Sequence, residues 1–558
     1  MNKLTTGDYV VFAIYFFVVA FYGLWVYRRK RKAETGSNDY FLAEGSLTWW
    51  AIGASLIASN ISAEQFIGMS GSGFKMGLAI ATYEWMAAAT LIIVAIFFIP
   101  VYLKNKIFTM PQFLNQRYNG TVAMIMAIFW LLLYVVVNLT SILFLGALAV
   151  SAISGVSLNA CIWGMAIFAV IITLGGMKVI GYTDVIQVFF LILGGLVTTY
   201  IAVNLVATHF GSPGILNGLS IMKNQAADHF HMIFNHDNPN YLDLPGLSVL
   251  IGGMWIVNLN YWGCNQYITQ RALGADLKTA RGGILFAAFL KLLMPVIVVL
   301  PGIAAFVLYK HDVFDFSHKI GTGGDMNPDR AYPILLNLLP SGLKGLSFAA
   351  LTAAVVASLA GKANSIATIF TLDVYKKINP GISEKQTVNI GKITVVVAMF
   401  LGIILCTHLG IDKKGGFQYI QEYTGFVSPG IFAMFILGFF WKKTTSNAAL
   451  FATVGGFILS CGFKVLPQYV NLAALAPSGF AAKNADTGIY EMPFIDRMGF
   501  VFLICVIGMY IISMIENAKG DKVHGLEVDS SMFKTSKGFA VGTLIVCGIL
   551  VALYSFYW

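Results

Sequence analysis

Apolar runs of about twenty residues follow one another along almost the whole chain, and this pattern limits the possible fold more than any other feature. About 20 consecutive apolar residues are needed for a helix to cross the hydrocarbon core of a bilayer. Of the 558 residues, 58% are hydrophobic and 11% are charged, whereas about a quarter of the residues of a soluble domain are charged. The sequence therefore predicts an all-α membrane protein that is embedded in a lipid bilayer.

Gaps that contain charged residues, Pro or Gly divide the apolar sequence into fourteen candidate membrane helices. These candidates cover residues 7–27, 49–70, 77–103, 121–154, 159–176, 182–206, 246–269, 279–309, 341–375, 387–409, 417–441, 445–465, 494–516 and 538–557. With the N-terminus outside, 21 of the 36 Lys and Arg residues fall in inside loops and 12 in outside loops. Because Lys and Arg concentrate in cytoplasmic loops, we predict that both termini lie outside. The basic residues are spread over short loops and do not indicate nucleic-acid binding.

The second predicted span contains polar residues at membrane depth. Ser59, Asn60, Ser62, Glu64 and Gln65 interrupt an otherwise apolar run. Polar groups in hydrocarbon are costly unless they face protein, water or a ligand. The stretch therefore predicts an interrupted helix that lines a functional site.

A second interrupted run lies five spans later, at residues 252–266, and contains Asn258, Asn260 and Asn265. An offset of five spans would invert the second copy, and transporters often contain two inverted repeats whose first helices are broken at the midplane. Either interruption could instead be a Gly-rich helix contact, but such a contact does not explain the clustered amides. We predict one transporter domain with accessory segment 1–48, repeats 49–206 and 246–441, and accessory helices in 442–558.

Other spans contain isolated polar residues beside aromatic ones. Glu84 lies between Tyr83 and Trp85, Lys291 lies midway along its span, and Gln421 lies in the eleventh span. Carboxylate, amide and ammonium groups next to aromatic rings suit the hydroxyls and apolar faces of a sugar. An unpaired buried ammonium is expensive, so Lys291 is expected to meet a carboxylate, an amide oxygen or a ligand hydroxyl. A purely structural salt bridge of Lys291 remains an alternative.

The ninth span contains a candidate ligand for a small cation. Ser358 is a hydroxyl on a helical face, and the break in the second span would leave free carbonyls near Ala58 and Ile61. Carbonyls of a broken helix together with side-chain oxygens suit Na⁺.

Six motifs resemble the sodium/solute symporter family, and within it the bacterial sodium-driven galactose and glucose carriers. They cover residues 60–71, 83–86, 183–190, 261–263, 286–291 and 418–425. The resemblance extends over nearly the whole chain. It implies a LeuT-type fold of fourteen helices in the cell membrane of a bacterium, and uptake of a monosaccharide by alternating access with Na⁺ as the co-transported ion.

The resemblance also implies a role for individual positions. The solute would contact Gln65, Glu84, Asn258, Tyr261, Lys291 and Gln421. Tyr261 would also be the inner gate, and the outer gates would be Met69, Tyr83 and Phe417. The Na⁺ ligands would be the carbonyls of Ala58, Ile61 and Ala354 and the hydroxyl of Ser358, with Asp184 on the path of ion release.

Three positions depart from the family pattern. Ala87 replaces a Ser that would contact the solute, and Ala357 replaces one of two adjacent Ser residues at the ion site. Lys362, one turn beyond Ser358, stands at a position that is usually apolar. Its ammonium could substitute for Na⁺, repel it, or extend toward the inner surface. Sodium coupling is the favoured expectation, and coupling to a proton or to no ion is the alternative.

Other functions remain open at this point. A carrier of the same fold could transport a polyol, sialic acid or an amino acid, and a membrane sensor or channel is a further alternative. An enzyme is disfavoured, because no nucleophile–base pair or metal-ligand pattern is visible. The loop at 207–245 contains His229, His231 and His236, but without metal-ligand spacing, and we predict a plain solvated loop there.

Overall fold

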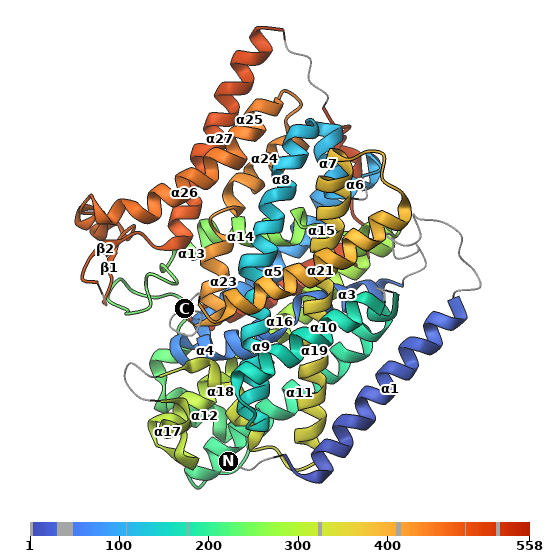
Figure 1. Ribbon diagram of the computed structural model, residues 1–558. Coiled ribbons are helices and arrows are strands. Elements are labelled where there is room, and N and C mark those ends of the chain that lie inside the picture. The colour runs from blue at the N-terminus through green and yellow to red at the C-terminus, as the bar shows by residue number, and fades with distance from the viewer. Residues whose placement is uncertain are drawn as a thin grey trace.

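The structure is a computed structural model that describes residues 4–30, 48–107, 109–175, 178–321, 326–408, 415–485, 487–520 and 525–558. Most of these residues are helical, and Figure 1 shows the helices packed side by side in one bundle. The strands of the described residues, β1 (Ala482–Lys483) and β2 (Tyr490–Glu491), form a short antiparallel pair at one side of the bundle.

The helices of the first half are α1 (Thr6–Lys30), α3 (Trp49–Asn60), η1 (Glu64–Met69), α4 (Ser70–Met76), η2 (Gly77–Ala81), α5 (Thr82–Ile93), η3 (Val94–Phe98), α6 (Ile99–Lys104), α7 (Met110–Arg117), α8 (Gly120–Leu132), η4 (Leu133–Leu139), α9 (Thr140–Ser154), α10 (Leu158–Gly175), α11 (Lys178–His209), α12 (Ile215–Gln225) and η5 (Ala227–Phe230). The second half contains α13 (Ser248–Ile251), α14 (Gly253–Cys264), α15 (Gln266–Leu273), α16 (Leu277–Lys310), η6 (Val313–Asp315), α17 (Phe316–Ile320), η8 (Pro328–Arg330), α18 (Ala331–Asn337), α19 (Leu343–Thr368), η9 (Ile369–Tyr375), α20 (Lys376–Ile378), α21 (Glu384–Cys406), α23 (Gly416–Thr424) and α24 (Ser428–Phe440). The C-terminal region contains α25 (Ser446–Leu450), η10 (Phe451–Gly455), α26 (Gly456–Val465), η11 (Leu466–Gln468), η12 (Ala473–Ser478), α27 (Phe494–Ala518), η13 (Ser530–Phe533) and α28 (Lys537–Phe556).

The bundle is that of a multi-pass membrane protein. Within the described residues, nine helical stretches are long and apolar enough to cross a membrane, or ten if α23 and α24, which are bent by 50°, form one span. The predicted span at 49–70 is interrupted after α3, and its last part belongs to the long helical stretch Glu64–Lys104. The predicted span at 246–269 is divided among α13, α14 and α15, none of which reaches the required length. The predicted span at 159–176 corresponds to a shorter apolar helix, α10.

Both predicted interruptions are present, and they resemble each other. Helices α3 and α14 each contain 12 residues. Each ends at a residue with extended backbone angles, Ile61 (φ −72°, ψ 115°) and Asn265 (φ −101°, ψ 119°). A residue in the extended region cannot continue the helix, so the last carbonyls before it lose their intrahelical partners, although the Ile61 N–H still donates to the Ile57 carbonyl at 2.8 Å. Two free helix ends therefore lie within the bundle.

Glycine brings α3 and α16 into close contact. A Cβ atom at Gly53 would lie 2.6 Å from the carbonyl oxygen of Gly283, so no larger residue fits there without a shift. Asn60 lies seven residues after Gly53, and Lys291 lies eight residues after Gly283. Each separation is about two helical turns. The Gly–Gly contact thereby aligns the end of α3 with the middle of α16.

The loop at 207–245 is packed against the bundle, so the prediction of a plain solvated loop is wrong. It contains α12 and η5, and the His229 ring stacks on Phe306 with ring centroids 3.9 Å apart. An imidazole nitrogen of His229 lies 3.0 Å from the carbonyl oxygen of Phe74. Burial lowers the pKa of His229. The histidine therefore packs as an aromatic group at one end of the bundle.

Candidate functional site

All six predicted solute-binding residues line one cavity between the two broken helices. They are Gln65, Glu84, Asn258, Tyr261, Lys291 and Gln421. Elements α3, η1, α5, α14, α16, α19 and α23 each contribute to its wall. The cavity volume is about 100 Å³, whereas small-molecule pockets commonly have about 300–1,000 Å³. The cavity is therefore contracted in this conformation.

A buried ion pair between Lys291 and Glu84 forms part of the cavity wall. The Lys291 ammonium lies 2.5 Å from Glu84 Oε2, and their side chains are 1% and 4% exposed. The same ammonium donates a hydrogen bond to Asn60 Oδ1 and lies 5.1 Å from the centre of the Trp262 ring. Of the three partners expected for Lys291, the carboxylate and the amide oxygen are present, and the alternative of a purely structural salt bridge fits the same contacts. Because both charges are compensated, this pair adds no net charge to the site.

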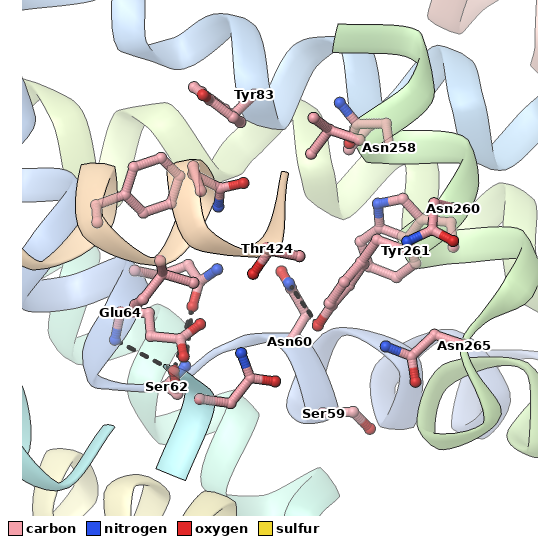
Figure 2. Close-up of a pocket in the computed structure, with 18 of the residues that line it drawn as sticks. Ser59, Asn60, Ser62, Glu64, Tyr83, Asn258, Asn260, Tyr261, Asn265 and Thr424 are labelled. Carbon is pink, nitrogen blue, oxygen red and sulfur yellow. Dashed lines mark hydrogen bonds between the residues drawn. The ribbon is translucent and has the colours of Figure 1, made fainter. Parts of the chain in front are cut away.

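Asn60 connects this ion pair to the predicted inner gate. Its Nδ2 donates a hydrogen bond to the Tyr261 hydroxyl at 3.2 Å, while its Oδ1 accepts one from Lys291. Figure 2 shows Asn60 and Tyr261 reaching toward each other from α3 and α14. The sequence showed Asn60 only as part of a polar interruption. Its position as the last residue of α3 gives it this bridging role.

Gln65 stabilises the break between α3 and η1. Its Oε1 accepts hydrogen bonds from the backbone N–H of Ser62 at 3.2 Å and from the Ser62 hydroxyl at 3.5 Å. The Ser62 hydroxyl also accepts a hydrogen bond from the backbone N–H of Glu64 at 3.2 Å. In the described part of the chain the Nε2 group of Gln65 has no hydrogen-bond partner, so it is the part of the amide that remains for a solute.

The other amides of the solute-binding set also keep unused polar atoms. Asn258 donates from Nδ2 to the carbonyl oxygen of Met254 at 3.2 Å, and its Oδ1 remains for a donor. Gln421 lines the cavity, and none of the hydrogen bonds among the described residues involves its side chain. The buried hydroxyl of Tyr83 likewise lacks a partner in that part of the structure. These groups can donate to and accept from hydroxyls.

Two of the three predicted outer gates form a contact at the cavity. Tyr83 and Phe417 meet edge to face, with ring centroids 5.0 Å apart and an interplanar angle of 87°. Met69 is fully buried but does not line the cavity. It follows Gly68, where an added Cβ would lie 2.9 Å from the backbone nitrogen of Phe417. Met69 therefore belongs to the buried packing of the segment that closely approaches α23.

A buried charge network anchors α23. Glu422 is next to Gln421 in sequence and is 4% exposed. Its Oε1 accepts a hydrogen bond from Arg497 at 2.6 Å and lies 2.9 Å from the ammonium of Lys464. The sequence pattern gives no indication that Arg497 is the partner of Glu422. The network fixes the helix that presents Gln421 to the cavity.

The predicted ion ligands lie in two places. Ser358 lines the cavity, whereas Ala58, Ile61 and Ala354 lie outside its lining. Ser358 and Ala354 are both buried on α19. Ala58 and Ile61 belong to the end of α3, where carbonyls lose helical partners. The side chain of the remaining predicted residue, Asp184, lies outside the described part of the structure.

Lys362 lines the same cavity and is 6% exposed. Its ammonium donates a hydrogen bond to Asn138 Oδ1 at 3.1 Å and lies 4.8 Å from the centre of the Tyr134 ring. The alternative in which Lys362 extends toward the inner surface is therefore wrong. The Tyr134 hydroxyl in turn donates to Asn265 Oδ1 at 2.9 Å, which connects this cluster to the break after α14.

Sequence comparisons identify a family and individual relatives of this chain. The family model for the sodium:solute symporter family matches residues 40–456. A sodium/glucose cotransporter of Vibrio parahaemolyticus is 45% identical over 100% of this chain and 99% of its own length. The human sodium/myo-inositol cotransporter 2 is 34% identical over 82% of this chain and 69% of its own length.

Solved structures share the fold at low sequence identity. A substrate-bound, outward-open Na⁺-coupled sialic acid symporter has a TM-score of 0.72 and 21% identity, covering 92% of this chain and 98% of that one. A nucleobase-cation-symport transporter in a closed conformation has a TM-score of 0.51 and 14% identity, covering 90% and 97%. The predicted relation to LeuT-type transporters is confirmed at the level of the fold. From the family match and the full-length relative, the chain belongs to the sodium:solute symporter family.

Proposed function

We propose that the protein imports a monosaccharide together with Na⁺ by alternating access. The observation that carries this proposal is the meeting of Gln65, Asn258 and Gln421 with the Lys291–Glu84 pair around one cavity between two broken helices. Family membership supports sodium-coupled solute transport. The full-length relative named as a sodium/glucose cotransporter supports a sugar.

The chemistry of the cavity favours a neutral solute with several hydroxyls. Within the proposed solute-binding set Lys291 and Glu84 compensate each other's charge, and the other ammonium of the cavity lining, Lys362, donates a hydrogen bond to Asn138, so this set offers no charged partner to a sialic acid or amino-acid carboxylate. The unused atoms of Gln65, Asn258 and Gln421 suit hydroxyls instead. A polyol presents the same groups and is the second candidate, which the myo-inositol cotransporter relative supports.

Two contacts at the cavity, one between aromatic rings and one hydrogen bond, support alternating access as candidate gates. The edge-to-face contact of Tyr83 and Phe417 would have to open for entry from outside. The hydrogen bond between Asn60 and Tyr261 would have to break for release inside. Because the cavity is contracted, a sugar requires rearrangement of at least one of these contacts. Met69 would act through the packing of the outer contact.

The proposed Na⁺ seat would lie between α3 and α19. The carbonyls of Ala58, Ile61 and Ala354 and the hydroxyl of Ser358 would bind the ion, and Asp184 would lie on its release path. The free carbonyls at the end of α3 and the position of Ser358 at the cavity support this seat. Bound Na⁺ would order the break that Gln65 stabilises, and this favourable coupling between ion and solute is reciprocal. The membrane potential adds about 2.3 kcal/mol per 100 mV for each charge.

We also propose fourteen spans with both termini outside, with repeats at 49–206 and 246–441 and accessory segments at 1–48 and 442–558. Loops assigned to the outside contact one another. The Thr5 and Ser341 hydroxyls lie 2.7 Å apart, and the Met232 N–H donates to the Tyr557 carbonyl at 2.7 Å. Loops assigned to the inside do the same through Asn105 and Glu527 at 2.9 Å. This grouping supports strict alternation of the spans.

Thermal stabilisation of the purified protein tests the solute class. We expect glucose or galactose, with Na⁺ present, to raise the melting temperature in a saturable way, because a ligand that binds only the folded state stabilises it. Gln65→Ala and Gln421→Ala should remove this shift while the protein remains folded. Gln116→Ala changes an exposed residue of α7 and should preserve it. Stabilisation by sialic acid or an amino acid, but by no sugar or polyol, would refute the proposed solute class.

A further inference from the structure

Lys362 is a charged residue in the interior of an apolar helix, and the proposed solute-binding set does not use it. It lies in α19, is 6% exposed and borders the cavity. Charged residues within membrane-spanning helices are expensive and are generally paired or functional. The Lys362 ammonium is therefore expected to have partners or a function.

The ammonium is held by groups from other elements. Asn138, on η4, accepts its hydrogen bond at 3.1 Å, and the ring of Tyr134 lies 4.8 Å away. Glu64, on η1, lines the same cavity as Lys362. We call Asn138, Tyr134 and Glu64 the ammonium cluster. It brings the charge of α19 next to the segment that carries Gln65.

The side-chain ligand of the proposed Na⁺ seat, Ser358, lies on the same helix as Lys362. Ser358 and Lys362 are four residues apart on α19 and therefore share a helical face, with Cβ atoms about 5–6 Å apart. A lysine ammonium is a compact charge on a flexible four-carbon stem. The oxygens that suit Na⁺ also accept hydrogen bonds from an ammonium. One stem can thus place its charge either in the ammonium cluster or at the oxygens beside Ser358.

We propose that Lys362 is a tethered cation that competes with Na⁺ for the seat beside Ser358, and that the ammonium cluster holds it away when Na⁺ binds. This inference rests on the proposed function, because it needs the sodium seat. Occupation of the seat by Na⁺ drives the ammonium toward Asn138 and Glu64. Since Glu64 is adjacent to Gln65, displacement of the ammonium also favours the ordered break that presents Gln65. The ammonium therefore raises the Na⁺ concentration that transport needs and strengthens its coupling to solute binding.

The test measures sodium-dependent sugar uptake in proteoliposomes. Lys362→Met removes the tethered charge and is expected to lower the Na⁺ concentration for half-maximal uptake by roughly tenfold, because two like charges at this spacing repel substantially. The half-saturating sugar concentration at saturating Na⁺ should stay within about twofold, whereas Lys362→Arg should keep the high Na⁺ requirement. Lys392→Met, at an exposed lysine of α21, is the matched control and should change neither value.

A variant that weakens the ammonium cluster but keeps Lys362 should change the half-saturating Na⁺ concentration in the opposite direction. Asn138→Ala is expected to raise the half-saturating Na⁺ concentration by several fold, and it provides the test if Lys362→Met does not fold. An unchanged or higher Na⁺ requirement in Lys362→Met, or an unchanged one in Asn138→Ala, would overturn the inference. Loss of maximal rate without a lower Na⁺ requirement would show a structural role only. If sugar uptake by the unaltered protein did not depend on Na⁺, the proposed function itself would be contradicted.

Discussion

Lys291→Met is expected to destabilise the protein and abolish sugar uptake, because it leaves the Glu84 carboxylate buried without its partner. The two groups are 2.5 Å apart and almost completely shielded from solvent. Removing one partner of such a pair costs about 3–5 kcal/mol, mostly because the other charge is stranded. Asn60 also loses the donor to its Oδ1. We therefore expect a clear fall in the melting temperature of the purified protein.

The double variant Lys291→Met, Glu84→Gln separates stability from binding. It removes the stranded charge, so most of the lost stability should return, because replacing a buried ion pair by uncharged groups is often neutral. Sugar uptake should remain absent, because two proposed solute contacts are changed. Lys392→Met is the control for the loss of a lysine on the protein exterior. Wild-type stability in the single variant, or no recovery in the double variant, would refute the assignment of a buried, mutually dependent pair.

Two further substitutions test the gates and the helix alignment. Phe417→Ala removes the edge contact with Tyr83 and should raise the half-saturating sugar concentration in uptake assays; an unchanged value would exclude Phe417 as a gate. Gly53→Ala places a Cβ 2.6 Å from the Gly283 carbonyl oxygen and should lower stability by about 1–3 kcal/mol, measured by thermal unfolding. Gly164→Ala, where a Cβ meets nothing within 4 Å, is the control and should be nearly neutral.

The helix breaks could be predicted from the sequence because polar side chains at membrane depth need an explanation. The end of α3 at Asn60 and the end of α14 before Asn265 both occur within the predicted interruptions. The number of crossings could not be obtained from helix length in the structure, since broken helices are too short to qualify individually. The repeat boundaries remain predictions.

Much of the cavity wall could be predicted, but the connections between its residues could not. The sequence predicts polar partners for the Lys291 ammonium, including a carboxylate. Only the packing of α3 against α16 shows that Asn60 also accepts a hydrogen bond from this ammonium. Asn138 appeared as a single amide in an apolar span, and only the folded structure places it next to Lys362. Local polarity predicts a solvated loop around His229, whereas the His229 ring packs on Phe306, because local polarity does not reveal tertiary packing. Contacts between residues that are far apart in the chain cannot be predicted from a local sequence pattern.

The central claim is that a sodium gradient drives the accumulation of a monosaccharide. The most direct measurement is uptake of radiolabelled glucose and galactose into proteoliposomes, with an inward gradient of Na⁺, K⁺ or choline and a fixed negative internal potential. We expect transient accumulation above the external sugar concentration with Na⁺ alone, and its loss when the Na⁺ gradient is collapsed. Equal uptake with all three cations, or equilibration without accumulation under the Na⁺ gradient, would contradict sodium-driven symport.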